Sequence, residues 1–204
     1  MDKWNILATK ETVDKTIKAL GENGMHAVFV NTKEEANKKI LELIPEKSEV
    51  FTMTSMTVEA LGILHTLNES GKYNSVRKKL SSMDREKHKG EMRKIGAASD
   101  YAIGSVHAVT MDGKVIIASN TGSQLPAYAY GSEKVIWVVG AQKIVKDLDE
   151  GMKRLYEHTL PLESERAKKA YGVPGSFVSK TLIVNKEVQK DRITIVFVNE
   201  VLGY

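Results

Sequence analysis

Cysteine is absent from this chain of 204 residues, and only four residues are proline. Without cysteine, the chain itself supplies no disulfides, no thiolate nucleophiles and no cysteine-bound zinc or iron–sulfur clusters. No stretch rich in proline, glycine and serine divides the sequence, and no run approaches the roughly 18 apolar residues of a membrane span. We therefore expect a single domain over residues 1–204 that does not enter a membrane.

Several signatures of targeting and catalysis are missing as well. The first residues, MDKWNILATKETVDK, lack the apolar segment and cleavage site of a secretory signal, so a cytoplasmic location is the simplest expectation. The sequence contains no Gly-x-Ser-x-Gly elbow, no Gly-x-Gly-x-x-Gly and no Walker-type loop. The five histidines have no ligand spacing with a carboxylate. We therefore predict no metal site, and the sequence identifies no cofactor.

Positive charge gathers in one segment of a chain whose net charge is +4. Residues 77–94 hold eight lysines and arginines against three aspartates and glutamates, so this segment carries +5. A solvated helical face is the ordinary interpretation of such a run, and a rim over an anion site or an acidic partner is the functional one. Nucleic acid is the less favoured partner, because no aromatic side chains interleave with these charges.

The first third of the chain alternates helical and extended patterns. Such alternation predicts parallel strands joined by crossover helices. In the third helical segment, Val58, Leu61 and His65 share one face, which places His65 in the core. The predicted helices cover residues 9–24, 32–45 and 55–71, and the predicted strands cover 25–30 and 49–53.

The second half adds an antiparallel element. Asp112 and Gly113 separate two β-rich runs within residues 108–119, which is a strong hairpin signal. We therefore predict an α/β domain whose mainly parallel sheet contains an antiparallel hairpin. Further strands are predicted at 101–104, 134–140, 180–185 and 192–204, further helices at 147–161 and 161–175, and short helical pieces within 72–99.

A polar stretch, SNTGSQLPAYAYG, joins two strand-like runs at residues 119–131. Asn120, Thr121, Gly122, Ser123 and Gln124 stand in a row between a strand and a short helix. Backbone N–H groups in such a turn are free to bind an anion, and glycine lets a ligand approach closely or adopts a positive φ. The alternative is a plain capped turn, because such clusters are common in loops.

A second hydroxyl-rich turn follows the strand predicted at 49–53. Thr54, Ser55 and Thr57 lie at the carboxyl end of that strand, where ligands bind in open α/β sheets. Glu59 follows in the first turn of the next helix. It is a candidate general base, or alternatively a carboxylate that interacts favourably with the helix dipole.

Two further candidates follow other strands. Ser105 and His107 come after the strand predicted at 101–104, where a histidine serves as acid, base or hydrogen-bond donor, or alternatively is only a hydrogen-bonded residue at the start of a strand. Lys143 comes after the strand at 134–140 and either pairs with a carboxylate or phosphate or is a solvated lysine. We expect the hydroxyl-rich turns to face one cleft, with Ser105 and His107 reaching the same cleft.

Five stretches of the chain resemble the LUD domain family of lactate-utilization proteins, once described as a domain of unknown function. The resemblance covers nearly the whole chain, and the long central block is its most specific part. The stretches are SMTVEALGI, SDYAIGSVHAVTMDGKVI, SNTGSQLPAYAYGSEKVIWVVGAQKIVKDLDEGMKR, LPLESERAKKAYG and ITIVFVNEVLG.

The resemblance implies a Rossmann-like, three-layer α/β/α fold, similar to that of the sugar-phosphate isomerase and CoA-transferase superfamily. The chain departs from the family where Thr52, Met53 and Thr54 replace a turn that is often glycine-rich, which implies a narrower anion pocket. Larger iron–sulfur members carry cysteine clusters that this chain lacks. A separate iron–sulfur protein and a second copy of the chain are therefore the protein partners to consider.

Two functions are compatible with these residues. In the first, the strand-end turns bind a small anionic metabolite, namely a 2-hydroxy acid, a sugar phosphate or an acyl-CoA, with Glu59 and His107 as the candidate catalytic groups. In the second, the chain is a non-catalytic accessory subunit of a lactate-oxidising iron–sulfur assembly. The two differ in whether acid–base groups converge on the hydroxyl-rich turns.

Overall fold

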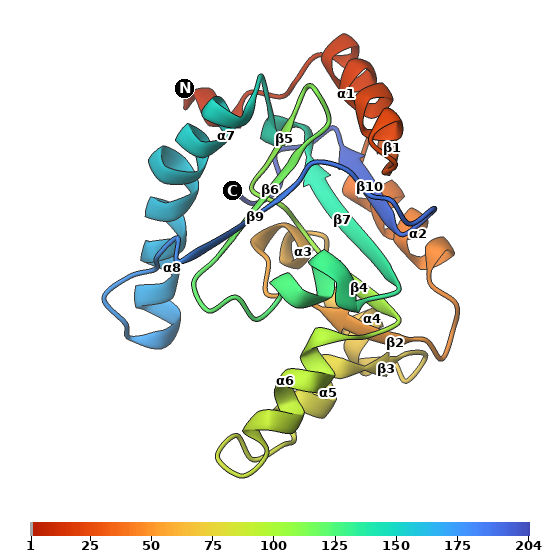
Figure 1. Ribbon diagram of the computed structural model, residues 1–204, viewed down its shortest axis with the longest axis vertical. Coiled ribbons are helices and arrows are strands. Elements are labelled where there is room, and N and C mark those ends of the chain that lie inside the picture. Colours follow the sequence, from red (N-terminus) through yellow and green to blue (C-terminus); the bar gives the residue numbers. More distant parts are fainter. Residues whose placement is uncertain (1) are drawn as a thin grey trace.

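A six-stranded sheet forms the centre of the computed structural model, which describes residues 2–204 (Figure 1). The strand order is β1–β10–β7–β4–β2–β3, and each neighbouring pair is parallel. The expected α/β fold with a mainly parallel sheet is therefore confirmed. The strands are β1 (His26–Val30), β2 (Glu49–Thr52), β3 (Asn74–Ser75), β4 (Tyr101–Gly104), β7 (Lys134–Gly140) and β10 (Ile193–Val198).

The middle of this sheet is buried on both faces. Along β7, Val135, Trp137 and Val139 pack into one hydrophobic cluster, while Ile136 and Val138 pack into another. Side chains alternate between the two faces of a strand, so a strand covered on both sides is an uninterrupted apolar run. The KVIWVVG segment is therefore the buried central strand that its composition predicts.

Three helices cover one face of the sheet. They are α2 (Lys33–Leu43), α3 (Met56–Ala60) and α4 (Leu64–Glu69). The first begins at a capping motif, in which Thr32 Oγ1 accepts from the Glu35 N–H at 3.2 Å and the Glu35 carboxylate accepts from the Asn31 N–H at 2.8 Å. Apolar side chains of all three helices share one cluster with the sheet.

The helix predicted over residues 55–71 is interrupted between α3 and α4. Gly62 adopts a positive φ of 71°, a conformation that most residues with a side chain avoid and that ends a helix. The interruption changes the helical phase of the residues that follow. His65 is consequently exposed, so the prediction that it packs in the core is wrong.

The second face of the sheet is covered by α1 (Lys10–Glu22) and a separate four-stranded sheet of order β8–β5–β6–β9. The predicted hairpin is present, but it belongs to this second sheet, and four residues, 111–114, join its two strands. Apolar side chains of both sheets share one cluster, which joins them through a common core. The strands are β5 (Ala108–Thr110), β6 (Val115–Ser119), β8 (Ile144–Val145) and β9 (Lys180–Val184).

A long C-terminal helical segment packs beyond the second sheet. It runs as α7 (Leu148–Arg154), a π-helical turn η4 (Leu155–Thr159) and α8 (Leu160–Tyr171) without a break. The wider turn immediately precedes Pro161, whose ring nitrogen has no proton to donate to the preceding turn. The remaining short elements are η1 (Lys3–Asn5), η2 (Ala127–Gly131) and η3 (Ala141–Lys143).

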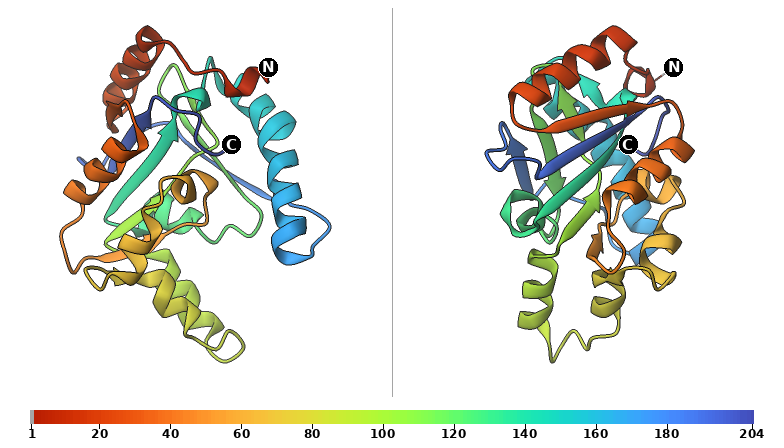
Figure 2. Two further views of the ribbon diagram at one scale, coloured as in Figure 1. Left: turned by 180° about the vertical axis from the view of Figure 1, so that it is seen from behind. Right: turned by 90° about the vertical axis from the view of Figure 1, so that its right-hand side faces the viewer.

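Two helices project away from the sheets as an arm (residues 76–97), as both views in Figure 2 show. The arm consists of α5 (Val76–Ser81) and α6 (Lys89–Ala97) and contains the basic segment 77–94. Its helices agree with the short helical pieces predicted in this region. In the part of the chain from residue 2 onward, no helix is both long enough and apolar enough to cross a membrane.

Candidate functional site

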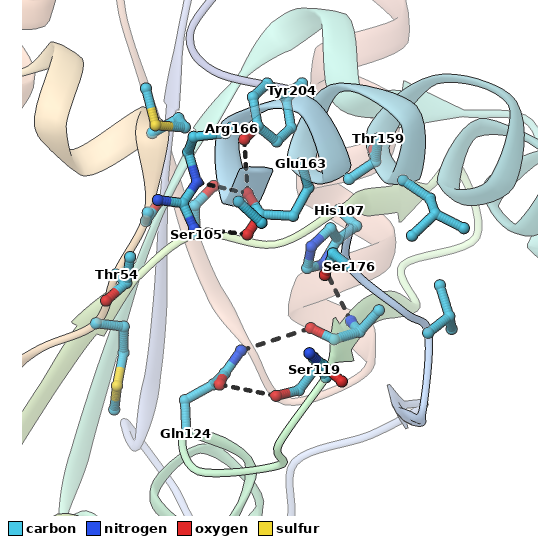
Figure 3. A pocket seen from close by; sticks show the side chains of 18 of the residues that line it. Thr54, Ser105, His107, Ser119, Gln124, Thr159, Glu163, Arg166, Ser176 and Tyr204 are labelled. Carbon is cyan, nitrogen blue, oxygen red and sulfur yellow. Dashed lines mark hydrogen bonds and ion pairs between the residues drawn. The ribbon is translucent and has the colours of Figure 1, made fainter. Parts of the chain in front are cut away.

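A cavity of about 430 Å³ lies where the loops after β2, β4 and β6 meet η3, α8 and the segment 173–178 (Figure 3). All the predicted site residues except Glu59 and Gly122 line it. The two hydroxyl-rich turns therefore face one cavity, although β6 belongs to the second sheet and not, as expected, to the same sheet as β2. The lining residues among those predicted are Thr54, Ser55, Thr57, Ser105, His107, Asn120, Thr121, Ser123, Gln124 and Lys143.

Lys143 lies at the inner end of the cavity and is 1% exposed. Its Nζ donates to Thr57 Oγ1 at 2.8 Å, to Ser105 Oγ at 3.2 Å and to the Val106 carbonyl at 3.1 Å. All three acceptors are neutral oxygens, and no ion pair among residues 2–204 includes Lys143. The alternative of a solvated lysine is therefore excluded.

A second buried cation lies behind the cavity wall. Arg154 is fully buried and donates from Nη1 to the His107 carbonyl at 2.7 Å and to Thr159 Oγ1 at 3.2 Å. Its Nε and Nη2 have no hydrogen-bond partner within the described chain. Burial lowers the pKa of Arg154 to about 10, and burial followed by the charge of Arg154 lowers the pKa of Lys143 well below its ordinary value.

His107 is held as a neutral hydrogen-bond donor. Its Nδ1 accepts from the backbone N–H of Ala118 at 3.0 Å, so Nε2 carries the ring proton. Burial, followed by the charges of Lys143 and Arg154, lowers the pKa of His107 to about 3 despite the opposing charge of Glu163. The ring consequently does not change its charge near neutral pH, and of the roles predicted for His107 the geometry favours that of a donor.

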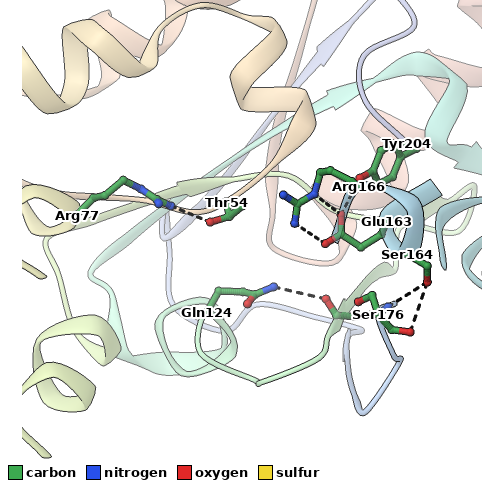
Figure 4. A network of polar contacts seen from close by, with 9 residues as sticks. Thr54, Arg77, Gln124, Glu163, Ser164, Arg166, Ser176 and Tyr204 are labelled. Carbon is green, nitrogen blue, oxygen red and sulfur yellow. Dashed lines mark hydrogen bonds and ion pairs between the residues drawn. The ribbon is translucent and has the colours of Figure 1, made fainter. Parts of the chain in front are cut away.

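One wall of the cavity is formed by an ion pair between Glu163 and Arg166 on α8, which was not predicted from the sequence. Arg166 binds the Glu163 carboxylate through two hydrogen bonds of 2.8 and 2.7 Å, and the Tyr204 hydroxyl donates to the same carboxylate at 2.6 Å (Figure 4). Burial raises the pKa of Glu163, but the hydrogen bonds from Arg166 and Tyr204 outweigh it and leave the pKa lowered. A Glu–Arg spacing of three residues was visible in the sequence, but it is typical of exposed helical ion pairs.

Two backbone N–H groups of the loop after β6 donate to side chains at the end of β6 and in the loop itself. The Gly122 N–H donates to Ser119 Oγ at 2.8 Å, and the Ser123 N–H donates to Thr121 Oγ1 at 3.3 Å. Gly122 has the positive φ of 84° that its sequence context suggests, but it does not line the cavity, and a Cβ there would meet the side chain of Lys180. The side chains of this loop, more than its amides, therefore face the cavity.

The segment 53–57, which runs from the loop after β2 into α3, is anchored from two sides. Thr57 is buried and donates to the Leu202 carbonyl at 3.2 Å while it accepts from Lys143. Thr54 accepts from Arg77 Nη2 at 3.2 Å, and this arginine is the first residue of the basic segment (Figure 4). No residue of 77–94 lines the cavity, so the arm does not form the rim that its charge suggested.

Glu59 is exposed on α3 and does not line the cavity. The structure therefore gives no geometric support to its candidate role as a general base at this site. Among residues 2–204, no cluster of three or more histidine, aspartate or glutamate side chains is arranged to hold a metal ion. The chemistry available in the cavity is that of a buried amine, hydroxyl groups, a neutral imidazole and an ion-paired carboxylate.

The chain matches the family model described as LUD domain over residues 13–198. A comparison with curated proteins returns no match. Among solved structures, the chain is similar to a DUF162 family protein from Deinococcus radiodurans, whose crystal structure was determined at 1.70 Å resolution. The two are 13% identical and superpose with a TM-score of 0.58 over 95% of this chain and 100% of that one, which supports the Rossmann-like α/β fold.

Proposed function

Since the chain belongs to the LUD domain family, we propose that it is a lactate-utilization-type protein whose cavity binds a small anionic metabolite. The observation that carries this proposal is the environment of Lys143, a buried amine whose hydrogen-bond partners are all neutral oxygens. Protonation of such an amine is unfavourable unless a negative charge compensates it. A carboxylate or phosphate in the cavity supplies that charge.

The carboxylate already present in the cavity is committed elsewhere. Glu163 binds Arg166 at both of its oxygens and also accepts from Tyr204. Arg154 lies behind His107 and adds a second positive charge close to Lys143. The balance of charge around the inner end of the cavity is therefore positive, and an anion bound there raises the pKa of Lys143 toward its ordinary value.

The size and lining of the cavity favour a compact polar ligand. Its volume of about 430 Å³ falls within the range of small-molecule sites. Hydroxyl and amide groups from the loops after β2 and β6 line the cavity, and these groups suit the hydroxyl groups of a 2-hydroxy acid or a sugar phosphate. An acyl-CoA is much larger and would enter only in part.

A non-catalytic accessory subunit is the second candidate function, and one observation favours it. The two acid–base groups expected from the sequence do not converge, because Glu59 lies outside the cavity and His107 is held neutral. Binding without proton transfer by these groups is compatible with a regulatory or assembly role beside an iron–sulfur protein. Turnover of a bound anion by the isolated chain would contradict this second candidate.

Calorimetric titration with lactate, ribose 5-phosphate, inorganic phosphate and acetyl-CoA tests the proposal. We expect at least one of these anions to bind the parent protein, and its affinity to fall by about tenfold or more in Lys143→Met, because a buried charge partner is lost. Lys146→Met is the matched control, since Lys146 is exposed on the same segment. Equal affinity in Lys143→Met and Lys146→Met, or no binding of any of these anions, would refute the proposal.

A further inference from the structure

Lys143 has the surroundings of an amine nucleophile. It lines the cavity, it is almost completely buried, and its hydrogen bonds go to neutral oxygens. Proteins activate lysine for attack on carbonyl groups by removing it from water or by placing it near another cation, because both keep the amine unprotonated. Lys143 meets both conditions, since it is desolvated and Arg154 lies close enough to lower its pKa further.

We propose that Lys143 forms a reversible imine with the carbonyl carbon of a 2-oxo acid bound in the cavity. This inference rests on the proposed binding of anions and specifies their class. In a 2-oxo acid the carbonyl carbon is bonded directly to the carboxylate, so one ligand supplies both an electrophile for the amine and a negative charge beside it. A 2-oxo acid is also the oxidised form of a 2-hydroxy acid, so both fit the same polar lining.

Formation of the imine requires no reagent other than the amine, the 2-oxo acid and one proton from water. The lone pair of Nζ adds to the carbonyl carbon, the carbonyl π electrons move to oxygen, and one proton moves from nitrogen to that oxygen to give a carbinolamine. The hydroxyl group then takes up a proton and leaves as water, while the nitrogen lone pair forms the C=N bond. The protonated imine carries one positive charge next to the ligand carboxylate, so the two form an ion pair inside the cavity.

Two neighbouring groups are positioned to assist this reaction, one by proton transfer and one by hydrogen bonding. Ser105 Oγ lies 3.2 Å from Nζ, within the distance needed to pass a proton between the nitrogen and the carbinolamine oxygen. His107 belongs to the same loop and keeps its Nε2 proton as a donor, because Nδ1 is occupied by the Ala118 N–H. A donor that stays neutral is suited to hydrogen-bond an oxygen on which negative charge develops.

Reductive trapping tests the inference. The parent protein is incubated at about pH 7 with pyruvate and sodium cyanoborohydride, and the modified residue is identified by intact mass and peptide mapping. We expect one reduced adduct per chain, located on Lys143 and formed at least about tenfold faster than on any exposed lysine, because exposed lysines are almost fully protonated at this pH. Lactate, which has no carbonyl group, should slow the labelling by competition.

Two variants and one independent measurement separate the outcomes. Lys143→Arg keeps a cation but lacks the nucleophile, so it should lose the adduct, whereas Lys146→Met should be labelled like the parent. Mapping on the parent protein gives an answer even if Lys143→Arg does not fold. Calorimetric binding of any of the four anions without an adduct on Lys143 would overturn the imine and leave anion binding intact, whereas no adduct and no binding of any of them would overturn both. Adducts spread over exposed lysines would also overturn the imine.

Discussion

Replacing Lys143 by methionine removes a buried amine and keeps a side chain of similar shape. The replacement breaks three hydrogen bonds and leaves the Val106 carbonyl without this donor. An unsatisfied buried acceptor costs about 1–3 kcal/mol, and this cost does not depend on pH. The removal of the amine also changes how the stability of the folded chain responds to pH.

The sign of that response follows from the lowered pKa of Lys143. Between its folded pKa and the ordinary value of 10.5, the unfolded chain binds a proton that the folded chain does not. Raising the pH through this window therefore stabilises the folded parent protein relative to Lys143→Met. The limiting slope for one proton is about 1.4 kcal/mol per pH unit.

Urea denaturation of both proteins at several pH values between about 7 and 9.5 measures this slope. We expect the stability difference between parent and Lys143→Met to change with pH in favour of the parent, while Lys146→Met follows the parent at every pH because Lys146 is exposed. His107 contributes a slope between its folded pKa of about 3 and its ordinary value of 6.5, and because both lie below this range it adds little slope here. Parallel stability curves for the parent and Lys143→Met would refute the assignment of Lys143 as an unprotonated buried amine.

Three further predictions concern the surroundings of the cavity. Gly122→Ala should lower the free energy of unfolding, measured by urea denaturation, by about 1–2 kcal/mol, because φ is positive there, and should change anion affinity, measured by calorimetry, less than about twofold. A large loss of affinity at unchanged stability would show that Gly122 contacts the ligand. Glu163→Gln should raise anion affinity by roughly three- to tenfold in calorimetry, because it releases the charge of Arg166, and a decrease would show that the carboxylate itself serves the ligand. Lys87→Gln combined with Lys89→Gln should leave the association rate of the anion and its salt dependence unchanged in stopped-flow measurements, because no residue of 77–94 lines the cavity. Slower association would mean that the arm steers the ligand.

Lys143 occupies a more central place in the cavity than its sequence context predicts. Sequence patterns direct attention to hydroxyl-rich turns and to backbone amides after β6. In the structure, two of those amides bind side chains of their own loop, and the group that we propose to recognise an anion is a buried lysine after β7. The turns at Thr54 and Ser123 line the same cavity as that lysine.

Much of the fold could be predicted from the sequence because it depends on local patterns. The apolar run of β7 predicts a strand that is buried on both faces, and the alternation of strands and helices predicts parallel strand pairing. Thr32 and Glu35 mark the start of α2 through contacts within a few residues. The prediction of one helix over 55–71 was wrong for a reason that is also local, since Gly62 adopts a positive φ and interrupts the helix.

Only the tertiary structure decided which sheet holds the hairpin and what surrounds Lys143. β6 pairs with β9, which lies far along the chain, and no local pattern encodes a partner at that distance. Lys143 becomes buried because Thr57 on α3 and Ser105 after β4 contact it from distant parts of the chain. The pKa of Lys143 is lowered because neighbouring residues remove the amine from water. Those residues are distant from Lys143 in the sequence, so local patterns do not predict this pKa.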